Sequence, residues 1–230
     1  MSDGTARASE DFGGVPVSNL WHMLLYAWRG QRFHSMVRRG VEDAPTLQAL
    51  LATVLVDLLN QRFRIGLGRE YIDTQEAIKG LRGRVDLERS LRERRFDRGE
   101  AVCRFTTYDH DAPRNRIIKS VLERLILKGD FGSDPKAATA LRARLRRAHR
   151  DMEGVRSFDA TVEDIRRIHL GPNDGDYRLM LNMCEFILAT LMPTHAPGTA
   201  PVRSWVQKGM HPLAKLFEDF VPAFLRRHLN

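Results

Sequence analysis

Residues 70–109 read EYIDTQEAIKGLRGRVDLERSLRERRFDRGEAVCRFTTYD, and their pattern differs from that of the sequence on either side. Residues 70–78 and 101–109 have the alternation and the β-branched residues that are typical of strands. Between them, a segment with Gly80 and Gly83 is followed by a short charged helix, predicted around residues 87–95. The stretch therefore predicts two strands that pair antiparallel.

The sequence on both sides of this stretch has the period of helices. Ser18 is expected to cap a helix over residues 18–29, and Thr46 opens a second helix with apolar residues at core spacing. Helices are also predicted over residues 114–128, 135–152, 161–170 and 176–192. We predict an α+β fold that is mostly helical, with a small antiparallel strand insertion near residues 69–108.

The composition indicates a basic protein that can bury a substantial core. The chain has 230 residues, 43% of them hydrophobic, and 37 Lys and Arg against 29 Asp and Glu, which gives a net charge of +8. This balance favours a polyanionic partner, nucleic acid first. No run of 18 apolar residues predicts a membrane helix, and the polar N-terminus does not resemble a signal peptide. Cys103 and Cys184, without a CxxC partner, fit a reducing cytoplasm.

Several catalytic motifs are absent from the sequence. No Gly precedes a Lys, so there is no P-loop to bind nucleotide phosphates. A nuclease of the PD-(D/E)xK type needs acids and a lysine beside the scissile phosphate, because carboxylates must hold Mg²⁺ there. The chain has no ExK, and its one DxK, at residues 134–136, is predicted to be a helix start, with Asp134 as the N-cap or a first-turn acid and Pro135 at N1. No complete nuclease site is visible.

The segment YDHDAPRNR, residues 108–116, allows two interpretations. Asp109, His110, Asp111 and Asn115 offer oxygen and imidazole ligands to a metal. Alternatively, Asp111 caps the helix that follows Pro113, and the preceding residues form the connecting loop. We favour the cap and predict no metal site.

Two groups of basic residues are candidates for contact with a partner. One is the stripe on the helix of residues 135–152, where Arg142, Arg146 and Arg150 could follow a phosphate backbone or face an acidic protein surface. The other is the turn KGLRGRVD, whose two glycines permit a positive φ or close backbone approach and so project cations outward.

Taken in order, five segments resemble one family: VPVSNLWHMLLYAW, IKGLRGRVDLERSLR, FTTYDHDAPRNRIIKSVLERL, GPNDGDYRLMLNMCEFIL and KLFEDFVPAFLRRHL. They are similar to McrC, the nuclease subunit of the McrBC-type, GTP-dependent systems that restrict modified DNA. The resemblance runs from about Val15 to Leu229. It implies that a partner AAA+ GTPase, McrB, forms a ring, recognises methylated cytosine and translocates. The N-terminal part of McrC is then expected to insert into that ring and to stimulate GTP hydrolysis, and a C-terminal nuclease domain to cut DNA with Mg²⁺.

The composition of the segments and the resemblance together predict a division of the chain. We expect a disordered N-terminus over residues 1–14, a partner-engaging domain over 15–192, a linker over 193–210, and the first helix of a truncated nuclease domain over 211–230. In that last helix Glu218 is a candidate outlying acid of the nuclease site, and Pro222 is expected to kink or restart the helix. The metal-binding strands would follow Asn230, so no activity is expected from this chain alone. Mg²⁺ is expected only with the missing nuclease domain, and GTP with Mg²⁺ on the partner.

The sequence therefore leaves three hypotheses of function. In the first, the chain binds and stimulates a McrB-like AAA+ GTPase. The candidate contacts are Lys79, Arg82 and Arg84 in the turn, and Asn115, Arg116 and Lys119 on the next helix. In the second, the chain is a basic DNA-binding module that uses the Arg142, Arg146 and Arg150 stripe. In the third, which the missing acid-x-lysine disfavours, it is a nuclease in its own right.

Overall fold

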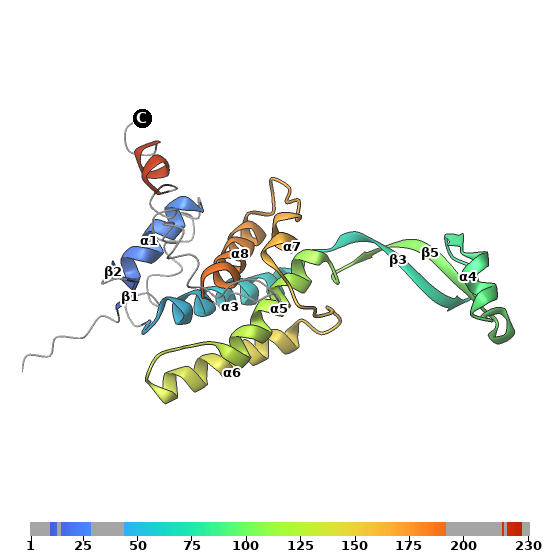
Figure 1. Ribbon diagram of the computed structural model, residues 1–230, viewed down its shortest axis with the longest axis horizontal. Helices are drawn as coiled ribbons and strands as arrows, with labels where there is room; N and C mark the ends of the chain where they lie inside the picture. The colour runs from blue at the N-terminus through green and yellow to red at the C-terminus, as the bar shows by residue number, and fades with distance from the viewer. Residues whose placement is uncertain (1–9, 13–14, 29–43, 192–217, 219, 227–230) are drawn as a thin grey trace, which may run out of the picture.

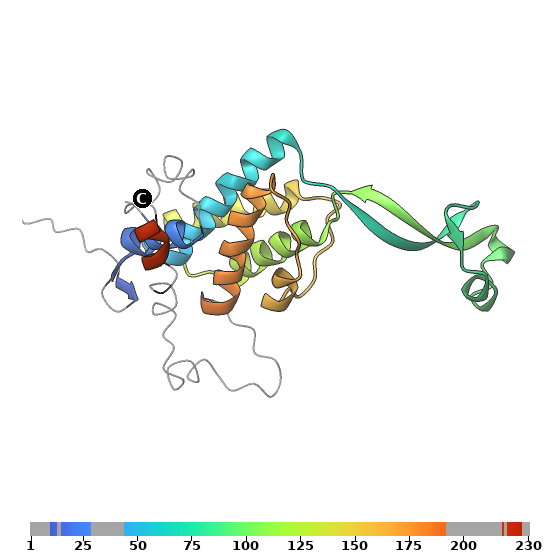
Figure 2. The same ribbon diagram turned by 90° about the horizontal axis from the view of Figure 1, so that it is seen from above.

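The computed structural model describes residues 10–12, 15–28, 44–191, 218 and 220–226. Two parts of very different shape make up this region, a body of packed helices and a long β-hairpin that projects from it (Figures 1 and 2). The prediction of an α+β fold with a small antiparallel insertion is confirmed.

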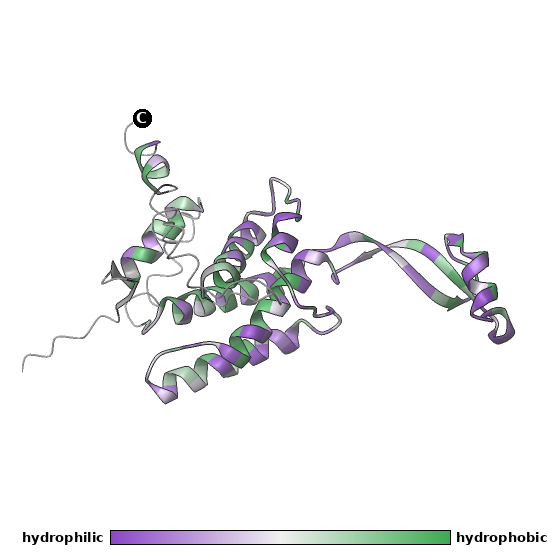
Figure 3. Cartoon of the chain, in the orientation of Figure 1, coloured by the Kyte–Doolittle hydropathy of each residue, from purple (hydrophilic) through white to green (hydrophobic). Residues whose placement is uncertain are grey.

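The helical body is built from four long helices. They are α3 (Leu47–Ile65), α5 (Pro113–Lys128), α6 (Pro135–Asp151) and α8 (Gly175–Phe186). Helix α3 packs against α6 and α8, and α5 packs against the same two helices, so leucines of α3 such as Leu50, Leu55 and Leu59 are fully buried. The buried side chains of these helices are mostly apolar, and in Figure 3 the helices carry both hydrophobic and hydrophilic residues along their length.

Shorter elements complete the body. Helix α1 (Val17–Ala27) contacts α3, α7 (Val162–Arg166) contacts α5 and α8, and η3 (Ile187–Leu191) continues α8 as a turn of π-helix. The first helix thus begins at Val17, and the single helix predicted over residues 176–192 changes to π geometry at Ile187. Strands β1 (Glu10–Phe12) and β2 (Val15–Pro16) form a small antiparallel pair. Glu10–Phe12 are thus a strand within the segment predicted to be disordered, and the rest of residues 1–14 lies outside the described residues.

Local signals set where two of the long helices begin. Thr46 caps α3, because its Oγ1 accepts a hydrogen bond from the Ala49 N–H at 3.0 Å. Asp134 caps α6 with Pro135 in the first turn, as the sequence predicted.

The hairpin consists of β3 (Glu70–Lys79), β5 (Glu100–Asp109) and the connecting residues 80–99, which we call the hairpin tip. Strands β3 and β5 pair antiparallel over their whole length, from Glu70 opposite Asp109 to Lys79 opposite Glu100. The tip carries β4 (Arg84–Val85), which pairs with the other edge of β5, then α4 (Leu87–Arg92) and η2 (Phe96–Arg98). Both views place the tip at the opposite end of the molecule from α1 (Figures 1 and 2).

The C-terminal segment packs on α1. Residues 220–226 are helical on both sides of Pro222, so the helix does not end at this proline. Phe220 and Phe224 each place their ring centroid 5.6 Å from that of Tyr26. Glu218 is exposed. The linker over 193–210 and residues 211–217 lie outside the described residues, and the assignment of 211–230 to a nuclease domain stays a prediction.

Candidate functional site: the hairpin tip

The basic turn predicted from the sequence lies at the far end of the hairpin. Lys79, Arg82 and Arg84 are all exposed, and the guanidinium of Arg82 lies 4.3 Å from the Phe105 ring centroid. Gly80 and Gly83 have φ of 91° and 64°, so both adopt the backbone conformation that side chains other than glycine rarely adopt. The turn therefore presents its cations to solvent, as the glycine spacing indicated.

The whole tip is rich in arginine. Residues 80–99 hold seven arginines (Arg82, Arg84, Arg89, Arg92, Arg94, Arg95 and Arg98) against four acids (Asp86, Glu88, Glu93 and Asp97). Some of these charges pair within the tip, such as Arg89 with Glu93 at 2.6 Å. Arg82, Arg84, Arg94 and Arg98 form no ion pair with another described residue. The tip is thus a basic surface with cations left to bind an acidic partner.

Large apolar side chains are also exposed at the tip. Leu87 and Leu91, four residues apart on α4, are 62% and 65% exposed, and Leu81 and Phe96 are 77% and 44% exposed. Apolar side chains surrounded by charge are typical of protein interaction sites.

Hydrogen bonds fasten α4 to the hairpin. Ser90, fully buried, accepts the Val102 N–H at 2.8 Å and donates to the Asp86 carbonyl at 2.6 Å. The Asp86 carboxylate accepts hydrogen bonds from the Arg89 N–H and the Arg104 guanidinium, each at 3.1 Å. These bonds, the backbone bond from Arg89 most of all, lower the pKa of Asp86. The tip is therefore a folded unit rather than an open loop.

The second predicted contact group, Asn115, Arg116 and Lys119, lies in the body, where its side chains form hydrogen bonds within the chain. Asn115 is fully buried and donates to the carbonyls of Gly68 and His110 at 2.9 and 2.7 Å. Lys119 Nζ donates to the carbonyls of Met152 and Val155 at 3.1 and 2.7 Å. Within the described chain these side chains hold loops together, so we do not carry them forward as a partner surface.

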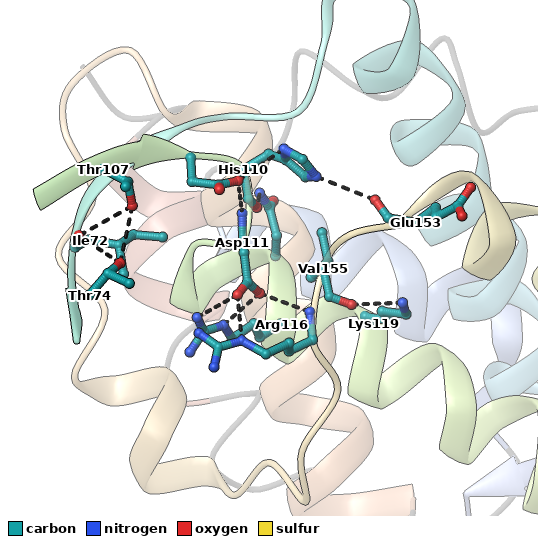
Figure 4. Close-up of polar contacts among 12 residues, drawn as sticks. Ile72, Thr74, Thr107, His110, Asp111, Arg116, Lys119, Glu153 and Val155 are labelled. Atoms are coloured by element: carbon teal, nitrogen blue, oxygen red, sulfur yellow. Dashed lines mark hydrogen bonds and ion pairs between the residues drawn. The ribbon is translucent and has the colours of Figure 1, made fainter. Parts of the chain in front are cut away.

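The third member of that group, Arg116, belongs to a partly buried cluster around Asp111 (Figure 4). The Asp111 carboxylate accepts two hydrogen bonds from Arg116, each at 2.7 Å, and from Arg156 a backbone bond at 2.8 Å and a side-chain bond at 2.6 Å. Burial alone would raise the pKa of Asp111, but these bonds outweigh it and hold the pKa well below its usual range.

This geometry corrects the predicted role of Asp111. Ala112, not Asp111, is the N-cap of α5, and no side chain caps this helix. The carboxylate instead accepts hydrogen bonds from Arg156, which lies 45 residues away in the sequence. The metal interpretation finds no support in the part of the chain that the structure describes, which holds no group of three or more His, Cys, Asp or Glu side chains placed for a metal ion.

The predicted basic stripe on α6 is only partly free. Arg142 folds back to donate to the Gly129 carbonyl at 2.8 Å, and its guanidinium lies 5.0 Å from the Phe131 ring centroid. Arg146 and Arg150 are exposed and line a shallow hollow of about 300 Å³ together with Leu127. Arg146 and Arg150 are therefore accessible to a ligand.

Sequence reasoning missed the residues that hold the root of the hairpin, which are Gly68, Arg114 and Tyr177. Arg114 is 6% exposed and Tyr177 is 1% exposed. Both are polar groups in otherwise apolar helix faces, which is the only signal the sequence offers for them.

Comparison with known proteins agrees with this arrangement. The family model described as McrBC 5-methylcytosine restriction system component matches residues 6–230. The chain is 27% identical over 218 residues to the type IV methyl-directed restriction enzyme EcoKMcrBC of Escherichia coli strain K12, covering 94% of this chain and 60% of that protein. It thus spans about three fifths of the length of this curated relative.

Two solved structures share the fold at 17% sequence identity. One is the Thermococcus gammatolerans McrBC complex, with a TM-score of 0.56 over 98% of this chain and 61% of the matched chain. The other is a half-complex from the tetradecameric assembly of Thermococcus gammatolerans McrB AAA+ hexamers with bound McrC, with a TM-score of 0.51 over 74% of this chain and 40% of the matched chain. The resemblance inferred from the sequence is confirmed, and the chain belongs to the family of McrBC 5-methylcytosine restriction system components.

Proposed function

We propose that this chain is a McrC-type subunit that binds a McrB-like AAA+ GTPase ring through its hairpin tip and stimulates GTP hydrolysis, in a system that restricts DNA carrying methylcytosine. DNA cleavage, with Mg²⁺, would require a nuclease domain whose core motif this chain does not contain.

The observation that carries the proposal is the projecting hairpin, whose tip exposes both arginines and large apolar side chains. A surface held far from the body can enter a space that the helices are too wide to enter, such as the centre of a ring (Figures 1 and 2). The arginines that form no ion pair with another described residue suit an acidic surface or the charge that develops on a phosphate during hydrolysis. The solved assembly that this fold matches is one of McrB AAA+ hexamers with bound McrC, which supports the choice of partner.

The test measures GTP turnover by the cognate McrB-like GTPase, with and without the full chain, and follows DNA cleavage in the same samples. We expect faster turnover without cleavage. Substituting both Arg82 and Arg84 by Ala should abolish the stimulation, because the turn loses its two exposed arginines while their backbone stays in place.

The matched control replaces Arg167 and Arg178 by Ala. Both are exposed arginines of the body, so the net charge changes equally. Stimulation that survives in this control and is lost in the Arg82/Arg84 variant supports the proposal. If the Arg82/Arg84 variant stimulates GTP turnover as strongly as the control and the parent, the turn does not contribute to the contact.

A second function, DNA binding through α6, is favoured by the exposed Arg146 and Arg150 beside their hollow. If each of these two arginines neutralises one phosphate, the logarithm of the binding constant falls with that of the salt concentration with a slope of about −1.8, or roughly 12-fold between 50 and 200 mM salt. Binding to duplex DNA that is insensitive to salt would contradict it.

A further inference from the structure

We propose that Gly68, Arg114, Asn115 and Tyr177 form a root cluster that fixes the direction of the hairpin relative to the helical body. These are positioning residues, which act on a partner only through the hairpin tip. The biological consequence rests on the proposed function, whereas the mechanical claim concerns this chain alone.

The first part of the cluster is a chain of buried hydrogen bonds. Tyr177 of α8 accepts the Gly68 N–H at 2.7 Å and donates to Asn115 Oδ1 at 2.8 Å. Asn115 Nδ2 donates to the carbonyl of Gly68, just before β3, and to that of His110, just after β5. One amide of α5 thus joins the two ends of the hairpin, and one hydroxyl ties this junction to α8.

The second part is Arg114, which binds the same junction from another side. Its guanidinium pairs with Glu70 of β3 at 2.9 Å and with Asp174, at the start of α8, at 3.0 Å, and donates to the Arg69 carbonyl at 3.2 Å. The guanidinium carbon also lies 4.5 Å from the Tyr177 ring centroid. Only a planar, several-pronged cation can make these contacts together, so lysine would not replace it.

Gly68 is needed for space rather than for its backbone angles. A Cβ atom at this position would lie 2.7 Å from Arg114 Nη2 and 2.9 Å from Tyr177 Cε2, well inside van der Waals contact. The strand root therefore sits directly against the two side chains that hold it.

The length of the hairpin explains why its root must be held firmly. Ten residues of strand span about 33 Å, so a rotation of about 10° at the root moves the tip by roughly 6 Å. A displacement of about 1 Å can already cost 100-fold in a step that depends on positioning. Near its root the hairpin is a two-stranded ribbon of β3 and β5, which has little else to fix its direction.

The test measures the distance distribution between spin labels on the hairpin tip and on the body of the full chain, without any partner. Cysteines introduced at Leu91 of the tip and Thr139 of α6 are exposed positions for the labels. Cys103 and Cys184 are both fully buried and will not take the label in the folded chain. Pulsed electron–electron double resonance then reports the spread of hairpin directions.

We expect a single narrow distribution in the parent and a clearly broadened or shifted one in the Tyr177→Phe and Arg114→Lys variants. The control is Tyr71→Phe, which removes a hydroxyl from a tyrosine on the hairpin that is 80% exposed. A thermal melt of each variant confirms that the body is folded. Distributions that match the parent's in both width and mean distance, in both cluster variants, would overturn the proposal.

Adding the GTPase separates this claim from the proposed function. If the cluster positions the tip, Tyr177→Phe lowers the maximal stimulation of GTP turnover, measured at a saturating concentration of the chain. Tyr71→Phe does not lower it. Suppose that the distance distribution broadens in Tyr177→Phe while the Arg82/Arg84 variant stimulates GTP turnover as strongly as the parent. The role of the root cluster in fixing the hairpin is then supported, and the proposed contact through Arg82 and Arg84 is contradicted. If Tyr177→Phe broadens the distance distribution but leaves the maximal stimulation unchanged, the cluster does not position the tip for the GTPase.

Discussion

Replacing Asp111 by Asn should destabilise the helical body by about 3 kcal/mol. The carboxylate is 13% exposed and accepts four hydrogen bonds, two of them from Arg116, whose side chain is 23% exposed. Breaking a buried ion pair costs roughly 3–5 kcal/mol, because the remaining charge is left without a partner. The Arg156 side chain is 73% exposed and can turn to water, so we take the lower end of that range.

The assay is urea unfolding at pH 7 together with thermal melting. At 2–4 °C per kcal/mol for a chain of this size, the melting temperature should fall by about 6–12 °C. The control is Asp97→Asn, an exposed acid of the hairpin tip, for which we expect a change within about 0.5 kcal/mol. A loss below about 1 kcal/mol for Asp111→Asn would refute the reasoning.

The same pair of proteins gives a prediction for pH. The pKa of Asp111 is lower in the folded chain than in the unfolded chain, so its contribution is complete above the unfolded pKa of about 3.9 and is lost as the pH falls towards the folded pKa. The stability difference between parent and Asp111→Asn should therefore be constant from pH 5 to 8 and shrink below about pH 4. A difference that grows on acidification would contradict this assignment.

Three further predictions concern other parts of the chain. Thr46→Ala should cost about 1 kcal/mol in urea unfolding through loss of the α3 cap, with Thr46→Ser restoring most of it. Ser90→Ala leaves the Val102 N–H without its hydrogen bond, at a cost of about 1–3 kcal/mol. Amide hydrogen exchange should become faster at Val102 while α3 stays protected. An equal increase in exchange at Val102 and in α3 would count against a separately folded tip. Cys103 and Cys184 are both fully buried, and burial raises the pKa of Cys184. Because a reagent cannot reach a buried thiol, neither cysteine should react with a thiol reagent at pH 8 until the chain is unfolded.

The sequence predicts elements well where the signal is local. The strands of the hairpin follow from alternation and β-branched residues, and the starts of α3 and α6 follow from Thr46 and Asp134, whose side chains bond to amides two or three residues on. The exposure of the turn follows from Gly80 and Gly83, because their positive φ is a property of the turn itself.

The sequence fails where partners are distant along the chain. Asp111 looks like a helix cap, but its carboxylate binds Arg156 across 45 residues, and no spacing rule indicates that. Asn115 and Lys119 look like a polar helix face, yet they bond to loop carbonyls that pack on α5 only in the folded body. Polar residues that become buried in this way cannot be told from surface residues by periodicity.

The central claim is that the hairpin tip, and not the body, contacts the GTPase, and photo-crosslinking tests it most directly. A photoreactive phenylalanine analogue is placed either at Leu91 of the tip or at Leu127 of α5, two leucines that are 65% and 78% exposed. Irradiation of the complex with the McrB-like GTPase and nucleotide should give a crosslinked product from position 91 and none from position 127. Crosslinking from 127 alone, or equally from both, would contradict the account.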